Sequence, residues 1–161
     1  MTHIAAFFYV AAMLLANLLV SKFGPAISPV LAFLLIGFDL SMRDWLHVRL
    51  SAKQMVGLIG VAGLLTYALN PAAGMIAVAS TAAFTSAALV DYQTFKQLRG
   101  SWLFRANGSN VAGAAVDSIV FVALVPFKVD PITATSLFLA KVAGGAIWAT
   151  LMNHASKKVE A

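Results

Sequence analysis

Two long stretches of this chain, residues 4–21 and 54–90, carry no charged residue. The second is too long for one membrane-spanning helix, which needs roughly 20 apolar residues, and Asn70 before Pro71 provides a turn within it. Only 11% of the 161 residues are charged and 61% are apolar, whereas soluble domains have about 25% charged residues. Because a soluble domain of this size would have too little polar surface, the sequence predicts one membrane domain over residues 1–161.

Apolar segments separated by polar or proline-containing turns predict an all-α integral membrane protein with six transmembrane helices. The expected helices cover about residues 4–21, 26–40, 54–69, 72–92, 109–127 and 132–153. Residues 41–53 and 93–108 are more polar, and each contains a tryptophan suited to the headgroup zone. We therefore expect these two segments to lie at the membrane surface.

The basic residues predict the orientation of the chain. One side of the membrane would hold eight of them and the other side two, with the remaining one inside a helix. The eight are Arg43, Arg49, Lys53, Lys96, Arg99, Arg105, Lys157 and Lys158; the two are Lys22 and Lys128; the last is Lys141. The positive-inside rule then predicts an inner (cytoplasmic) membrane protein with both termini in the cytoplasm. It also explains the net charge of +5 without a nucleic-acid partner.

Several kinds of chemistry have no support in the sequence. The chain has no cysteine, and its histidines, His3, His47 and His154, lie far apart. Neither a nucleotide-binding loop nor a hydrolase or metalloprotease motif is present. We therefore expect no metal, no cofactor and no enzyme activity, and favour the passage or binding of a small molecule.

Two charged residues fall in the middle of predicted helices. A charge at the bilayer centre costs about 2.5–3.5 kcal/mol on insertion scales. Asp117 and Lys141 should lie at similar depth on antiparallel neighbours, so they can pair directly. One interpretation is that the pair neutralises itself and joins two helices. The other is that Asp117 lines a substrate cavity, because Asn107 and Asn110 share its helical face.

Three other polar residues are weaker candidates for a substrate site. Asp91 lies near the cytoplasmic end of the fourth predicted helix, where water can solvate it. Asn17 can be a ligand or can bond to a neighbouring helix, and Asp39 is expected at an interface. The sequence leaves these alternatives open.

The chain resembles the queuosine precursor transporter family (VUT, vitamin uptake transporter-like). The matching elements follow the family order: Asn17 with Lys22, Asp39, Asp91 to Lys96, Arg105 with Ser109 and Asn110, Asp117-Ser118 with Phe121, and Lys141. The chain departs from the family in having Arg43 where an acidic residue is expected, and in its shorter length.

This resemblance implies a six-helix bundle similar to vitamin-binding S-components, from a bacterium or a phage. It also implies uptake of a purine-like 7-deazaguanine base such as 7-cyano-7-deazaguanine. Asp117 would then bind the N–H edge of the base, and Lys141 would compete for the same carboxylate. The carbonyl and ring nitrogens of the base would be recognised by the side chains of Asn110, Asn107 and Asn17. Arg105 would act as a gate or an anchor and would not recognise the base.

Two other functions remain open from the sequence. The chain can be an S-component-like binding module that needs an ATP-driven partner. It can also be a structural protein in which Asp117 and Lys141 satisfy each other. A homodimer is compatible with the short chain, although no motif requires one.

Overall fold

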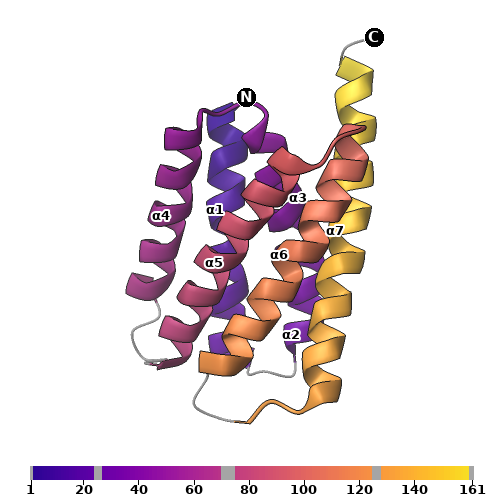
Figure 1. The fold of residues 1–161 in the computed structure, drawn as a ribbon. Coiled ribbons are helices and arrows are strands. Elements are labelled where there is room, and N and C mark those ends of the chain that lie inside the picture. Colours follow the sequence, from indigo (N-terminus) through magenta and orange to yellow (C-terminus); the bar gives the residue numbers. More distant parts are fainter. Residues whose placement is uncertain (1, 24–26, 70–74, 125–127, 160–161) are drawn as a thin grey trace.

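The protein is an all-helical bundle, as a computed structural model shows for residues 2–23, 27–69, 75–124 and 128–159 (Figure 1). Its elements are α1 (Thr2–Phe23), α2 (Ser28–Leu31), the π-helix η2 (Ala32–Ile36), α3 (Gly37–His47), α4 (Ala52–Leu69), α5 (Met75–Gln97), α6 (Trp102–Leu124) and α7 (Pro131–Val159). Since α2, η2 and α3 follow one another without a break, they form one helix, and the described residues contain six helices and no strand. The predicted fold class is confirmed.

Length and composition allow four of the helices, α1, α4, α6 and α7, to cross a membrane. The other two, α2–η2–α3 and α5, carry charges inside the bundle. Both termini and the short connections before α4 and α6 lie at one end, which we call the terminus end (Figure 1). The connections 48–51 and 98–101, which belong to the two segments expected at the same membrane surface, therefore lie at one end of the molecule.

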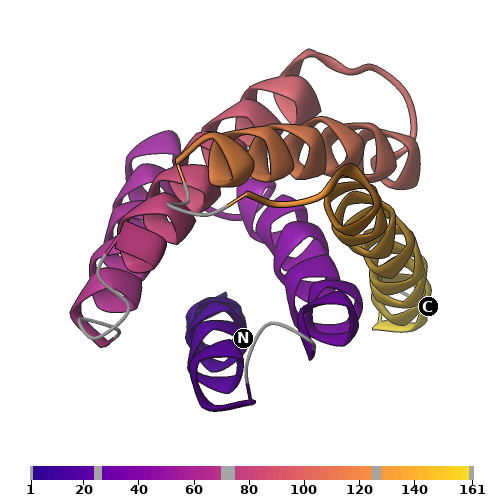
Figure 2. The same cartoon turned by 90° about the horizontal axis from the view of Figure 1, so that it is seen from below.

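The α2–η2–α3 helix is the centre of the bundle. The α3 part contacts α1, α4, α5, α6 and α7, and Figure 2 shows the central helix between α1 on one side and α6 and α7 on the other. Ser41, Asp44 and Leu46 are fully buried. The prediction that this helix ends near residue 40 and continues as an interfacial segment is wrong.

The physical reason for this error is that the charges of α3 find partners inside the protein. Asp39 and Arg43 are four residues apart, so they face each other on the same side of the helix, and Asp44 bonds to α6. A hydropathy scale counts each charge as exposed to lipid or water. Paired charges in a helix enclosed by other helices escape that penalty.

The fifth predicted helix was expected to begin at residue 109, but α6 begins at Trp102. Ser101 caps it, because its hydroxyl accepts a hydrogen bond from the Phe104 amide at 3.2 Å. The preceding Gly100 has φ of +123°, a conformation that side chains disfavour. The predicted helix end at residue 127 and the expected turn at Asn70 and Pro71 lie outside the described residues.

The central helix and α7 approach each other very closely. A Cβ atom added to Gly144 would lie 2.0 Å from the Phe33 carbonyl oxygen, so only glycine fits there. The Trp148 indole donates a hydrogen bond of 3.0 Å to the carbonyl of Leu34, inside the π-helix. A side chain of α7 therefore binds a backbone carbonyl of the π-helix directly. This contact fixes the depth of α3 against α7.

Candidate functional site

An arginine with two carboxylates lies in the middle of the bundle. Arg43 is only 2% exposed, and its Nη2 is 2.7 Å from Oδ2 of Asp39 on the same helix. Its Nη1 is 3.6 Å from Oδ2 of Asp91 on α5, which is an ion pair without hydrogen-bond geometry. The guanidinium carbon also lies 5.5 Å from the centre of the Phe84 ring. Since Asp39 and Asp91 are 1% and 0% exposed, the whole ion cluster is sealed from solvent and lipid.

A third carboxylate belongs to the same region. Asp44 is fully buried, and its Oδ2 is 2.9 Å from the hydroxyl of Ser109 on α6. That hydroxyl is also 3.0 Å from the Ala106 carbonyl, and it can donate to only one of the two at a time. The Asp91 carboxyl lies near Ser109 as well. Among the described residues, Asp44 therefore has no basic hydrogen-bond partner of its own.

Polar groups of α3, α6 and α7 continue the site toward the opposite end. The Ser41 hydroxyl donates to the Gly145 carbonyl at 2.8 Å, and the Asn110 amide nitrogen is 3.5 Å from the Ser41 oxygen. Gly145 packs directly on Asn110, since an added Cβ would come within 2.9 Å of its amide nitrogen. Ser41 and Asn110 are 0% and 1% exposed. We call Asp39, Ser41, Arg43, Asp44, Asp91, Ser109 and Asn110 the central polar cluster.

Many atoms of the central polar cluster lack a hydrogen bond. Among the described residues, the buried atoms without a partner include Asp39 Oδ1, Asp44 Oδ1, both carboxylate oxygens of Asp91, Asn110 Oδ1, and Nε and Nη1 of Arg43. The Tyr9 hydroxyl of α1, beside Arg43, belongs to the same group. An unsatisfied buried polar atom costs about 1–3 kcal/mol, and more when it is charged. Native cores rarely keep so many together without a functional reason.

The cluster also contains more acidic side chains than basic ones. Three carboxylates, Asp39, Asp44 and Asp91, share one guanidinium, that of Arg43. Because each buried ion costs several kcal/mol of lost hydration, this arrangement contributes little to stability. Such polar groups within a membrane bundle are typical of a site for a polar solute or an ion path. The described residues contain no group of three histidine or acidic side chains placed to hold a metal ion.

Asp117 and Lys141 form an ion pair that is separate from the central polar cluster. The Lys141 ammonium pairs directly with Asp117 Oδ2, and Ser118 lies 3.3 Å from the same nitrogen. The predicted contact between the two charges is therefore confirmed. Their side chains are 23% and 9% exposed, so the pair lies less deep than the central polar cluster. Whether it binds substrate or only joins α6 to α7 stays a prediction.

The remaining candidates lie in other contacts. The Asn17 amide donates to the Met13 carbonyl and accepts a hydrogen bond of 3.0 Å from Ser80, so it joins α1 to α5. Arg105 donates from Nε to the Phe95 carbonyl at 3.0 Å, near the terminus end. Asn107 is half-buried, and its Oδ1 has no hydrogen-bond partner in the described part of the chain. The structure thus brings three of the predicted residues together, Asp39, Asp91 and Asn110.

Arg43 and Asp44 were not predicted as site residues, because the polar pattern of residues 41–53 is typical of a segment at the membrane surface. The four-residue spacing of Asp39 and Arg43 was an available signal, since it predicts a pair on one helix face. Ser41 had no such signal. Ser109 was noticed only through the family resemblance.

Comparison with known proteins agrees with this architecture. Residues 3–156 match a family model described as "Putative vitamin uptake transporter". No curated protein and no solved structure is similar enough to the chain to count as a match. The family match covers nearly all of the 161 residues and includes all six helices of the bundle. The chain therefore belongs to the vitamin uptake transporter family of membrane proteins.

Proposed function

We propose that this protein takes up a 7-deazaguanine base, a precursor of queuosine, across a bacterial inner membrane with both termini in the cytoplasm. The observation that carries the proposal is the central polar cluster, where buried donors and acceptors from α3, α5 and α6 remain unpaired. A guanine-like base offers N–H donors on one edge and acceptors on its carbonyl and ring nitrogens. The cluster offers the complements: carboxylates, a guanidinium and a side-chain amide.

Asp91 is the best placed carboxylate for the N–H edge, since both of its oxygens lack a hydrogen bond. Asn110 and Arg43 supply donors for the carbonyl and ring nitrogens of the base. Tyr9 of α1 and Phe84 of α5, whose ring centres are 6.3 Å apart, lie beside Arg43 and provide aromatic surface for a flat ring. In this proposal Asp117, Lys141, Asn17 and Asn107 line the route toward the cluster.

The cytoplasmic placement of the terminus end rests on its basic residues. Arg43 no longer counts, because it is buried in the bundle. Seven of the original eight remain on that side, against Lys22 and Lys128 on the other. The positive-inside rule still favours the same orientation.

The function is tested in a bacterial strain that needs queuosine and cannot make it. Expression of the protein should restore queuosine in tRNA when 7-cyano-7-deazaguanine is supplied at limiting concentration. Failure by a correctly inserted protein would exclude this cargo. Asp91→Asn and Asp117→Asn should both abolish uptake if both carboxylates meet the base, whereas loss with Asp91→Asn alone would leave Asp117 as a helix-joining residue.

A second function is favoured by the description of the matched family, which names vitamin uptake. In that case the protein is a vitamin-binding module similar to S-components, and an ATP-driven partner supplies the energy. Uptake by the protein alone in reconstituted vesicles would exclude this possibility. Uptake that stops when a co-purifying ATPase is removed would support it.

A further inference from the structure

A layer of stacked aromatic and cationic side chains covers the central polar cluster at the terminus end. The His47 ring stacks on Tyr92, with centres 4.1 Å apart and planes 11° apart. Its centre is also 4.9 Å from that of Phe95. The Arg105 guanidinium lies 4.1 Å from the centre of the Phe95 ring and donates to the carbonyl of that residue. We call His47, Tyr92, Phe95 and Arg105 the aromatic layer.

The layer lies one helical turn from the buried carboxylates on the same three helices. His47 follows Asp44 by three residues on α3, and Phe95 follows Asp91 by four on α5. On α6, which runs in the opposite direction, Arg105 precedes Ser109 by four residues. Residues three or four apart lie above one another on a helix. His47, Phe95 and Arg105 therefore each lie one turn above a residue of the cluster, and Tyr92, which directly follows Asp91, is a second residue of α5 in the layer.

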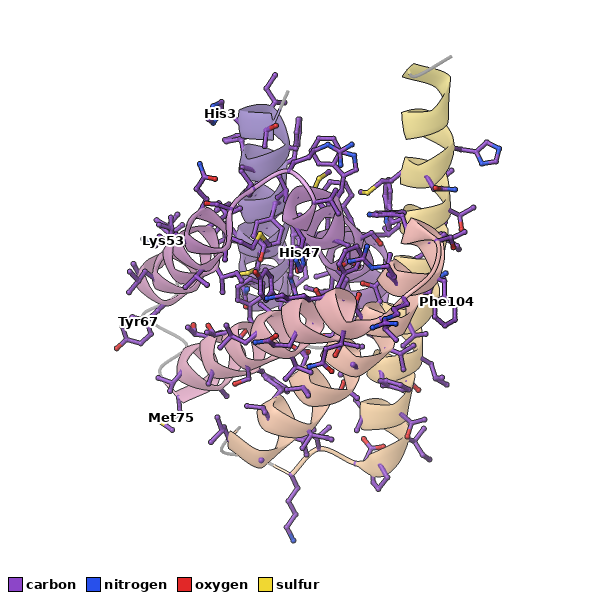
Figure 3. The ribbon with its side chains drawn as sticks, turned by 45° about the horizontal axis from the view of Figure 1, so that its top comes forward. His3, His47, Lys53, Tyr67, Met75 and Phe104 are labelled. Atoms are coloured by element: carbon purple, nitrogen blue, oxygen red, sulfur yellow. The ribbon has the colours of Figure 1, made fainter. Side chains whose placement is uncertain are left out.

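On α3 the layer lies between the buried cluster and the terminus end, because His47 is the last residue of that helix. Asp44, Asp91 and Ser109 are nonetheless fully buried. Figure 3 shows His47 among the helices, whereas Phe104 projects away from the bundle. Arg105 is the charged member of the layer. It donates a hydrogen bond to the Phe95 carbonyl on α5 and does not bond to a carboxylate of the cluster.

We propose that the aromatic layer is the gate of the transporter at the terminus end, and that it opens when His47 leaves the Tyr92 ring. Stacked rings suit this role, because they exclude water when closed and part without breaking a buried ion pair. The inference deepens the proposed function by assigning a conformational device to the same site. It does not depend on the identity of the cargo.

The absence of cysteine in the native chain permits a direct test by cysteine accessibility. Ser109→Cys places a thiol just beneath the layer, and Ser101→Cys places one in the exposed connection at the same end. A membrane-impermeant maleimide is applied to vesicles that present the terminus end. In the otherwise native chain, the thiol at position 101 should react at least about 100-fold faster than the one at position 109.

Opening the layer should expose the buried thiol. In the Ser109→Cys background, Tyr92→Ala should accelerate labelling at least about tenfold, and Tyr92→Phe, which keeps a ring on His47, should not. Phe104→Ala, which removes an aromatic ring that is 60% exposed on the same helix as Ser109, is the matched control and should leave the rate unchanged. His47→Ala provides a second opening variant if Tyr92→Ala does not insert correctly.

Equal labelling at positions 101 and 109 in the native layer would overturn the proposal, because the layer would then not seal the cluster. The same conclusion follows if neither opening variant accelerates labelling, since helix packing alone would then protect the thiol. Failure of the transport proposal is a separate outcome. It would appear as absent uptake with the labelling pattern intact.

Discussion

Substitution of Gly144 by alanine tests whether the close contact between the central helix and α7 positions the site. The added Cβ would lie 2.0 Å from the Phe33 carbonyl oxygen, 2.8 Å from its carbonyl carbon and 3.0 Å from its Cα. All three are backbone atoms, so no side-chain rotation relieves the overlap. Since a comfortable contact is about 3.3 Å, the helices must separate by roughly 1.3 Å. Overpacking costs about 1–3 kcal/mol where small adjustments suffice, and we expect the upper end of that range here.

The control is Gly57→Ala on α4, where an added Cβ has no atom within 4 Å. Both substitutions gain up to about 1 kcal/mol of helix propensity, so their difference isolates the packing cost. Gly144→Ala should therefore be less stable than Gly57→Ala by about 3 kcal/mol, or roughly 6–12 °C in thermal unfolding. Thermal unfolding in detergent measures this difference. Equal stability of the two variants would refute the close helix contact.

Three further perturbations test the charged groups. Arg43→Met leaves Asp39 with no cation and should destabilise the protein by about 3–5 kcal/mol, measured by the same thermal unfolding. Replacing Asp117 by Leu and Lys141 by Met together should preserve folding, whereas Asp117→Leu alone strands the buried lysine and should lower the yield of folded protein. Asp130 precedes α7. The hydroxyl and backbone amide of Thr133 donate hydrogen bonds to its carboxyl group and lower the pKa of that group. Its contribution to stability is present above the pKa of an unfolded aspartate, about 3.9, and is lost as the pH falls through the lower folded value. Asp130→Ala should thus be less stable than the native protein at pH 7 and equally stable at strongly acidic pH, and a constant difference between the two would contradict this.

The sequence predicted most of the fold because the physical signals are local. Long apolar segments define helices, and a short polar turn between two of them makes antiparallel neighbours. The contact between Asp117 and Lys141 could be predicted in this way, from their matching depth on two consecutive helices. The sequence also predicted that segments 41–53 and 93–108 face the same side of the membrane, because two helices separate them.

The central helix could not be predicted from hydropathy. Its charges identify it as a surface segment if each is considered alone, and burial becomes possible because they pair with one another and with side chains of α5 and α6. Asp91 shows the same limit, since a position near a helix end allows both solvation and burial. The second partner of Arg43 is 48 residues away in sequence, so no local pattern connects them.

The central claim is that the buried carboxylates around Arg43 bind the cargo. It is tested most directly by equilibrium binding of labelled 7-cyano-7-deazaguanine to purified protein in lipid nanodiscs. Asp91→Asn removes one hydrogen-bonding charge at nearly constant volume and should weaken binding about 10- to 100-fold, while the exposed Asp130→Asn should bind as the native protein does. Unchanged affinity in correctly folded Asp91→Asn would contradict the assignment of the site.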